Sequence, residues 1–385
     1  MLHAAALIDQ AVARTGLHEF GAPSWREGLD RVVASFNEDA ALNAFGAEQV
    51  SALLVDKLAN RLQIEHWHHR YPEIAAQPVE RPVFGLGLPR TGSTALGVIL
   101  GQDPDTRVLR TWEARQPCPP PKAGDMGDPR IAAAQAWLDA TLAADPSLGA
   151  MIPMSADAAT ECLLLTAMDF RSTEFEAFGR MNSYNRWLLE TDMEPAYRFH
   201  RRVLQLLQWR CPPTRWFLRT PAHSAFLPAL DAVYPDARFV MTHRDVTRVL
   251  PSNMTLVLAL SQAFTDRPDH PAMARHMIDF WEASLRRLVA FREAGNADRF
   301  HDIAFGDFQS DPIGEIRRLY AWLDQPLTAA AEHRMRRWWQ AQGEERPSGS
   351  KIDFAGLGIP LDEIRDRFAF YTERYVDRSA ASSAT

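Results

Sequence analysis

The stretch from Val83 to Thr94 reads VFGLGLPRTGST, and it decides the fold. Its first part, Val83–Gly87, is a short apolar run of the kind that forms a buried parallel strand. A tight loop, Leu88–Ser93, follows, and residues 94–100 then show apolar side chains at helical spacing. Turn N–H groups and a helix N-terminus both attract anions, so strand, loop and helix in this order predict a phosphate-binding site.

Segments further along the chain continue the same pattern. Short apolar runs at Trp216–Leu218, Arg238–Thr242 and Arg299–Phe305 predict three more strands. Helical patterns separate them at Ser224–Val233 and after Asp311, an N-cap residue followed by proline. Strands that alternate with helices indicate a mostly parallel sheet covered on both faces. We therefore predict an α/β, P-loop-like three-layer fold with large helical additions.

The outer parts of the chain are mostly helical. We predict an N-terminal helical segment over residues 1–80, an α/β core over 81–340 and a C-terminal extension over 341–385. A proline cluster begins a helical insertion at about 115–210, which is a plausible lid over a bound substrate.

Composition limits the classes of function. A net charge of −7 argues against a broad nucleic-acid surface, so an anion site must be local. Cys118, Cys162 and Cys211 are too far apart in sequence to suggest a disulfide framework or a zinc site. Polar residues interrupt Met1–Leu17, which favours a helix over a signal peptide, and no apolar run approaches the ~18 residues of a membrane span. These features predict a cytoplasmic protein.

The loop differs from that of a kinase. Its two glycines are spaced as in a nucleotide-binding P-loop, but Ser93 takes the place of the P-loop lysine. The basic residue is Arg90, inside the loop. We find no acidic strand end suited to Mg²⁺.

A second segment offers another phosphate contact. Arg244 follows the strand predicted at Arg238–Thr242, and Ser252 lies eight residues later on a predicted helix. An arginine at a strand end and a serine about two turns into the next helix can converge on one phosphate, the first through a bidentate fork and the second through a hydroxyl.

Together these segments resemble the sulfotransferases that depend on 3′-phosphoadenosine 5′-phosphosulfate (PAPS), especially a bacterial branch with a P-R-[ST]-G-[ST]-[ST] loop. Residues 89–94 match that loop, Arg244 and Ser252 match the 3′-phosphate site, and residues 305–312 (FGDFQSDP) resemble the family's Y-E-D-L-x-x-D-P. The resemblance covers about residues 82–325, with its segments in the family's order.

The resemblance implies a co-substrate and its contacts. PAPS would be the donor and 3′-phosphoadenosine 5′-phosphate (PAP) the product. The residues implied in binding are Arg90, Thr91, Gly92, Ser93, Thr94, Arg244 and Ser252. Arg90 stands where the cytosolic branch has lysine, so it should act as an electrostatic clamp and not as an acid. Phe305 replaces the family's tyrosine at the adenine, and Ser348–Lys351 is a weak substitute for the C-terminal phosphate loop.

Two residues compete for the role of the base that deprotonates the acceptor. Glu113 resembles the base of the tyrosylprotein branch, and we favour it because Trp112 beside it could raise its basicity. The purely structural alternative is an ion pair with Arg110 or Arg115. His223 resembles the histidine of the cytosolic K-T-x-H region, with extra residues before it.

The acceptor is predicted to be a small molecule, an apolar alcohol or phenol, because residues 110–200 are rich in aromatic and methionine side chains. These include Trp112, Met151, Met154, Phe170 and Trp187, which could equally be ordinary core. The His-rich stretch Glu65–His69 lacks a second ligand cluster, so no metal is predicted. The oligomeric state stays open.

Two other functions remain as alternatives. A P-loop-type nucleotide kinase would share the strand, loop and helix, and a Mg²⁺ requirement with ATP would favour it. A non-catalytic nucleotide-binding protein would keep PAPS binding without a base. The fold alone excludes neither.

Overall fold

The computed structural model describes residues 1–125, 127–151, 155–212, 215–341 and 352–376. Its centre is one five-stranded sheet in the order β2-β3-β1-β4-β5, and every neighbouring pair is parallel. The strands are β1 (Val83–Gly87), β2 (Thr106–Val108), β3 (Arg215–Arg219), β4 (Arg238–His243) and β5 (Phe300–Ala304). The four predicted strands are confirmed, and β2 is an additional, three-residue strand at the sheet edge.

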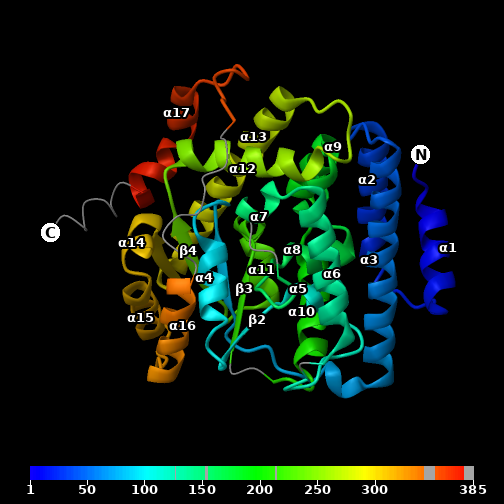
Figure 1. Ribbon diagram of the computed structural model, residues 1–385, viewed down its shortest axis with the longest axis horizontal. Coiled ribbons are helices and arrows are strands. Elements are labelled where there is room, and N and C mark those ends of the chain that lie inside the picture. Colours follow the sequence, from blue (N-terminus) through cyan, green and yellow to red (C-terminus); the bar gives the residue numbers. More distant parts are fainter. Residues whose placement is uncertain (126, 152–154, 213–214, 342–351, 377–385) are drawn as a thin grey trace.

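Helices make up most of the remaining chain. The α-helices are α1 (Ala4–Thr15), α2 (Ser24–Glu38), α3 (Ala44–Arg70), α4 (Ser93–Leu100), α5 (Thr111–Arg115), α6 (Pro129–Ala144), α7 (Ser147–Met151), α8 (Leu163–Thr166), α9 (Asn182–Glu190), α10 (Glu194–Gln208), α11 (Leu227–Val233), α12 (Val246–Ser261), α13 (His270–Phe291), α14 (Phe305–Ser310), α15 (Pro312–Trp322), α16 (Ala329–Ala341) and α17 (Leu361–Tyr371). Two short 3₁₀ turns also matter below, η3 (Thr173–Phe178) and η4 (Pro221–Ala225). Figure 1 shows α1 to α3 on one side of the sheet and α14 to α16 on the other.

Side chains of β1 alternate between two hydrophobic cores. Phe84 and Leu86 belong to the larger core, whereas Val83 belongs to the smaller one, with Leu96 and Ile99 of α4. Such alternation is the normal consequence of the two-residue period of a strand. Both faces of the sheet are therefore covered, which confirms the predicted three-layer α/β fold.

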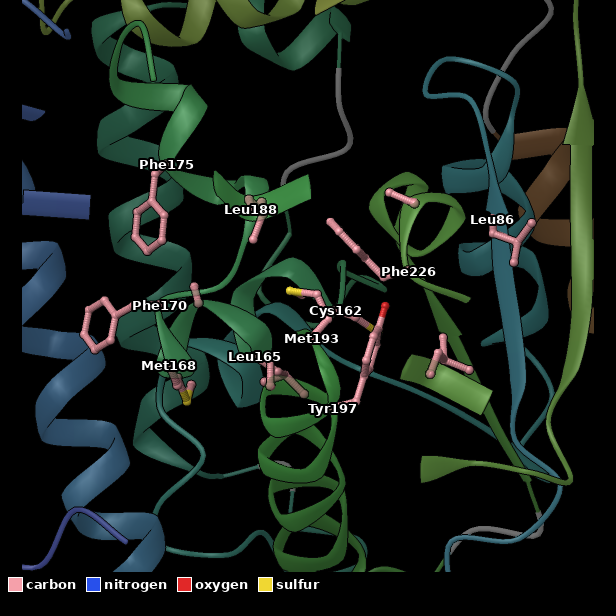
Figure 2. Close-up of a cluster of buried hydrophobic side chains, with 14 of the residues drawn as sticks. Leu86, Cys162, Leu165, Met168, Phe170, Phe175, Leu188, Met193, Tyr197 and Phe226 are labelled. Carbon is pink, nitrogen blue, oxygen red and sulfur yellow. The ribbon is translucent and has the colours of Figure 1, made fainter. Parts of the chain in front are cut away.

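The larger core continues into the N-terminal helices. Figure 2 shows it extending from Leu86 on β1, past Met193 and Leu165, to Phe170 and Phe175. Each such fully buried side chain contributes about 1.5–3 kcal/mol to stability relative to an exposed one. The α1–α3 segment thus shares its core with the α/β centre.

Polar contacts fix α3 against its neighbours. Arg61 of α3 pairs with Asp169 at 2.9 Å, and both side chains are buried. Within the His-rich stretch, Glu65 pairs with Arg202 of α10 at 2.7 Å, and His68 Nε2 lies 3.0 Å from the Arg202 carbonyl oxygen. This stretch therefore joins α3 to α10.

The helix predicted to begin at Asp311 is confirmed. The Asp311 carboxylate accepts a hydrogen bond from the Gly314 N–H at 2.8 Å, and Pro312 occupies the first helical position. Its buried face includes Ile313, Ile316 and Tyr320. Among the described residues, no helix is both long and apolar enough to cross a bilayer.

Candidate active site

The loop after β1 has the backbone of an anion cradle. Gly87 has φ 114°, and a Cβ there would lie 2.9 Å from the Thr242 carbonyl oxygen, so only glycine fits. Arg90 (φ 63°) and Gly92 (φ 92°) are also left-handed. Left-handed residues within a turn make neighbouring N–H groups converge, which creates a concave anion-binding surface.

Helix α4 completes the cradle. Gly92 is its N-cap and Ser93 its first residue, so the first-turn N–H groups have no partner inside the helix and are available to an anion. Thr91 is buried, and its hydroxyl donates to the Leu88 carbonyl oxygen at 2.8 Å and meets the Thr242 hydroxyl at 2.5 Å. Thr91 therefore holds the loop to β4, while Ser93 and Thr94 begin the helix.

The structure brings the two predicted phosphate segments together. Arg244 Nη1 donates a hydrogen bond of 3.0 Å to the Arg90 carbonyl oxygen. Arg90 Nε donates to Ser252 Oγ at 3.2 Å, and Arg90 Nη1 donates to the Met151 carbonyl oxygen at 2.7 Å. Residues that are 154 and 162 positions apart in the sequence thus form one cluster.

This cluster concentrates positive charge. Burial, followed by repulsion from Arg248 and Arg90, lowers the pKa of the Arg244 guanidinium from its usual value. The guanidinium lies 3.9 Å above the Phe305 ring, which also packs on Gly92. Three arginines close together make the local potential positive, which suits the cluster to phosphate groups.

A hydrogen-bonded network lies beside Arg244. The preceding residue, His243, bonds Tyr371 Oη through Nδ1 at 2.9 Å and Asp302 through Nε2 at 2.8 Å. Burial tends to raise the pKa of Asp302, but hydrogen bonds from Arg292 and His243 outweigh it and hold that pKa well below its usual range. The network joins β4, β5 and α17 behind the cluster.

The carboxyl end of β3 lies beside the loop. Ser224 Oγ accepts from the Gly87 N–H at 3.0 Å, which ties η4 to the start of the loop. His223 is buried, with Nδ1 2.8 Å from Tyr197 Oη and no partner for Nε2 among the described residues. Burial, and then the nearby His200, lower the pKa of His223 well below its usual value, so the ring is neutral at pH 7.

Glu113 is held in a buried ion pair. Its carboxylate accepts hydrogen bonds from Arg107 Nη2 at 2.7 Å and from the Arg110 N–H at 3.3 Å. Arg107 also donates to the carbonyl oxygen of Cys211, which precedes β3. The ion-pair partner is Arg107, and not Arg110 or Arg115.

One carboxylate at the loop edge was not singled out from the sequence. Glu161 pairs with Arg219 at 2.8 Å and accepts from Thr220 Oγ1 at 3.0 Å, where β3 ends. Its side chain is 28% exposed, whereas Glu113 is 4% exposed. A glutamate within a loop has no periodic pattern around it, so only its contacts with Arg219 and Thr220 reveal its position.

The aromatic and methionine side chains of residues 110–200 are not gathered at one pocket. Phe170 and Trp112 are buried in separate hydrophobic clusters, and Trp187 packs against the larger core. Of this set, Met151 reaches the loop through its carbonyl oxygen. Met154 and Ser348–Lys351 lie outside the described residues.

Comparison with known proteins identifies the family. Residues 82–329 match the model described as the sulfotransferase family. The chain belongs to this family. It is therefore a transferase of sulfuryl groups, in agreement with the resemblance seen in the sequence.

Solved structures agree with this assignment. Sulfotransferase STF9 from Mycobacterium avium is 31% identical, with a TM-score of 0.91 over 98% of this chain and 97% of that one. Sulfotransferase STF1 from Mycobacterium tuberculosis H37Rv is 29% identical, with a TM-score of 0.86 over 96% of this chain and 98% of that one. This sulfotransferase thus shares its whole described fold with both.

One curated relative is named by its substrate. Omega-hydroxy-beta-dihydromenaquinone-9 sulfotransferase Stf3 from Mycobacterium bovis is 31% identical over 107 residues. That match covers 28% of this chain and 28% of the relative, so the chain matches little more than a quarter of that protein's length.

Proposed function

We propose that this sulfotransferase uses PAPS and transfers its sulfuryl group to a hydroxyl, or an amine, of a small apolar acceptor. The observation that carries the proposal is the cluster of Arg90, Arg244 and Ser252 around the loop. A donor with phosphate groups at both its 5′ and 3′ positions needs two anion contacts close together. Backbone N–H groups of the loop suit the 5′ end, and Arg244 with Ser252 suits the 3′-phosphate.

The order of strands gives the site two sides. Arg244 follows β4 and Phe305 follows β5, so the nucleoside would extend from β1 across β4. Phe305 offers an apolar ring to a base, although Arg244 covers one of its faces. The carboxyl end of β3, on the other side of β1, is then left for the acceptor.

The reaction requires charge stabilisation and one proton acceptor. The acceptor oxygen attacks sulfur in line, a new oxygen–sulfur bond forms, and the bond from sulfur to the bridging phosphate oxygen breaks. Negative charge then grows on the departing PAP phosphate. Arg90 and the first-turn N–H groups of α4, together with Ser93 and Thr94, would stabilise that charge. The acceptor's proton leaves to a base.

Three groups can be weighed as this base. Glu113 is only 4% exposed, and its carboxylate is paired with Arg107. His223 is neutral with Nε2 unpartnered among the described residues, but the side chain is only 1% exposed. Glu161 is 28% exposed at the carboxyl end of β3. We therefore assign the base to Glu161, with Arg219 and Thr220 holding its carboxylate.

The named substrate of the Mycobacterium bovis relative supports an apolar acceptor. That relative is an omega-hydroxy-beta-dihydromenaquinone-9 sulfotransferase. An acceptor of the same general kind, a lipophilic alcohol, fits the apolar character of the helices around the loop.

Calorimetric titration with PAP, without metal, tests the donor. Wild type should bind PAP at micromolar concentration, and Arg244→Ala should weaken binding about 10- to 100-fold, because charged hydrogen bonds contribute about 1.5–3 kcal/mol. Arg198→Ala is the matched control, since that side chain is 69% exposed on α10. No PAP binding by wild type, together with Mg²⁺-dependent ATP binding, would overturn the proposal in favour of a kinase.

A set of three amide variants tests the base. Glu161→Gln should lower turnover about 10²- to 10⁴-fold and leave PAP affinity unchanged, because the substitution removes the proton acceptor and its ion pair with Arg219 but no group of the proposed PAP site. Glu113→Gln and His223→Gln are compared in the same assay. Near-normal turnover by Glu161→Gln would contradict the assignment, and the role would pass to whichever of the other two variants has lost turnover.

A further inference from the structure

Helix α12 begins at the nucleotide side and passes to the acceptor side. It follows β4, and its Ser252 contacts Arg90 in the loop. Figure 1 shows α12 lying across the end of the molecule, over the strands. Beyond its end, the Asn43 N–H donates to the Phe264 carbonyl oxygen at 2.9 Å, so the helix leads toward the N-terminal helices. The second half of α12 therefore lies on the side assigned to the acceptor.

One ridge of α12 continues from the serine. Ser252, Leu256 and Leu260 are spaced four residues apart, so their side chains share one face. The core-facing residues of the helix include Met254, which is 1% exposed. Leu256 and Leu260 are half-buried and, within the described ranges, pack against neither hydrophobic core.

The segment Asp145–Met151 runs alongside this ridge. Gln262 Nε2 donates to Asp145 Oδ2 at 2.9 Å, beyond the end of α12. At the other end of the segment, the Met151 carbonyl oxygen accepts from Arg90, which also contacts Ser252. The segment Asp145–Met151 therefore borders the ridge and is held by a hydrogen bond near each of its ends.

The far end of the ridge is aromatic. Phe264 stacks on Phe45, with ring centroids 5.8 Å apart, and packs on Phe178 at 4.8 Å. Phe45 is 51% exposed, which is unusual for so large an apolar side chain. From Ser252 to the end of α12 at Ser261, a helical rise of 1.5 Å per residue gives roughly 14 Å, a length that an extended hydrocarbon chain can span.

We propose that Leu256 and Leu260 bind the hydrocarbon part of the acceptor, whose chain leaves the site past Phe264 and Phe45. This inference rests on the proposed function, and it defines the acceptor as a long-chain lipophilic alcohol. The reacting hydroxyl lies at the Ser252 end, next to the loop, and the apolar chain lies along the ridge. Leu256 and Leu260 are apolar and half-buried, and they lie outside both cores. A substrate chain along the ridge would cover them during turnover, which accounts for their position.

The test is a series of straight-chain primary alcohols of increasing length, sulfated with PAPS. In wild type each added methylene should raise kcat/KM about fourfold, which corresponds to about 0.8 kcal/mol per buried methylene. The rise should stop once the chain spans the ridge. In the double variant Leu256→Ser/Leu260→Ser, each added methylene should leave kcat/KM almost unchanged.

The control is Leu361→Ser, because Leu361 is an apolar side chain 40% exposed at the first residue of α17 and is not part of the ridge. It should keep the wild-type dependence on chain length. PAP titration of every variant shows whether it is folded and binds the donor. Two results would overturn the inference while the proposed function stands. In the first, wild type binds PAP and turns over, but kcat/KM does not depend on chain length. In the second, the double variant shows the same dependence on chain length as wild type. Failure of wild type to bind PAP would overturn both.

Discussion

Two arginines of this molecule show the difference between a structural and a binding site. Arg61 is a residue of α3 and reaches η2 (Ala167–Asp169), whereas Arg244 contacts the loop after β1. Each guanidinium sits over a phenylalanine ring, at 4.1 Å for Arg61 and Phe199 and 3.9 Å for Arg244 and Phe305. Each also donates to backbone carbonyl oxygens. Burial is the main cause that lowers the pKa of both.

Their charged neighbours differ. Asp169 pairs with Arg61 and raises its pKa again, so the buried charge is compensated within the fold. Repulsion from Arg248 and Arg90 lowers the pKa of Arg244 further, and the attraction of Asp245 offsets this only in part. Arg61 thus has a buried carboxylate paired with it, whereas Arg244 has no such ion pair among the described residues and is suited to an external anion. This contrast supports the proposed role of Arg244 in donor binding.

The largest expected effect concerns the compensated pair. Arg61→Ala leaves Asp169 buried with Arg171 as its remaining cation, and should lower the free energy of unfolding by about 3 kcal/mol. Urea unfolding measures this change. Arg248→Ala, at a side chain 68% exposed, should stay within about 0.5 kcal/mol of wild type. Equal destabilisation by both variants would contradict the structural role of Arg61.

A carboxylate introduced next to the loop should balance the positive charge of the cluster. Ser252→Asp places an acid next to Arg90, as Asp169 lies next to Arg61, and should weaken PAP binding about 100-fold by repelling phosphate. Ser252→Ala removes only a hydroxyl and should weaken binding about fivefold, or roughly 1 kcal/mol. Calorimetry compares the two variants. Similar affinities would show that charge balance does not govern this site.

A smaller effect should appear at the buried histidines. Burial lowers the pKa of His200 to about 3, compared with about 6.5 in an unfolded chain. Between these values the unfolded state binds more protons. The stability present above pH 6.5 is therefore lost as pH falls, by up to about 1.4 kcal/mol per pH unit for this histidine.

His200→Gln should reduce this pH dependence, because glutamine does not titrate. The measurement is urea unfolding at pH 5 and pH 7 for wild type and variant. An unchanged difference between the two pH values would assign the dependence to the other histidines whose pKa values burial lowers, which are His68, His223, His276 and His301.

The sequence predicted the parts of the fold that depend on local pattern. The apolar run Val83–Gly87, the N-cap at Asp311 and the strand Arg238–Thr242 all follow from neighbouring residues, and the structure has each of them. The edge strand β2 has only three residues, too few for a hydrophobic period, and its pairing with β3 is a long-range contact. Short edge strands are therefore missed when the sequence is read locally.

The sequence by itself also supplied the residues of the proposed site, because Arg90, Gly92 and Ser93 lie within four positions and Arg244 and Ser252 lie eight residues apart. Only the tertiary structure decided which charges are compensated. The contact of Arg244 with Arg90, the pairing of Glu113 with Arg107 and the place of Glu161 beside Arg219 depend on strand order and helix packing. The physical reason is that the role of a charged group is set by its neighbours in space, and hydrogen-bond partners of Arg244 and Glu161 lie 154 and 58 positions away along the chain.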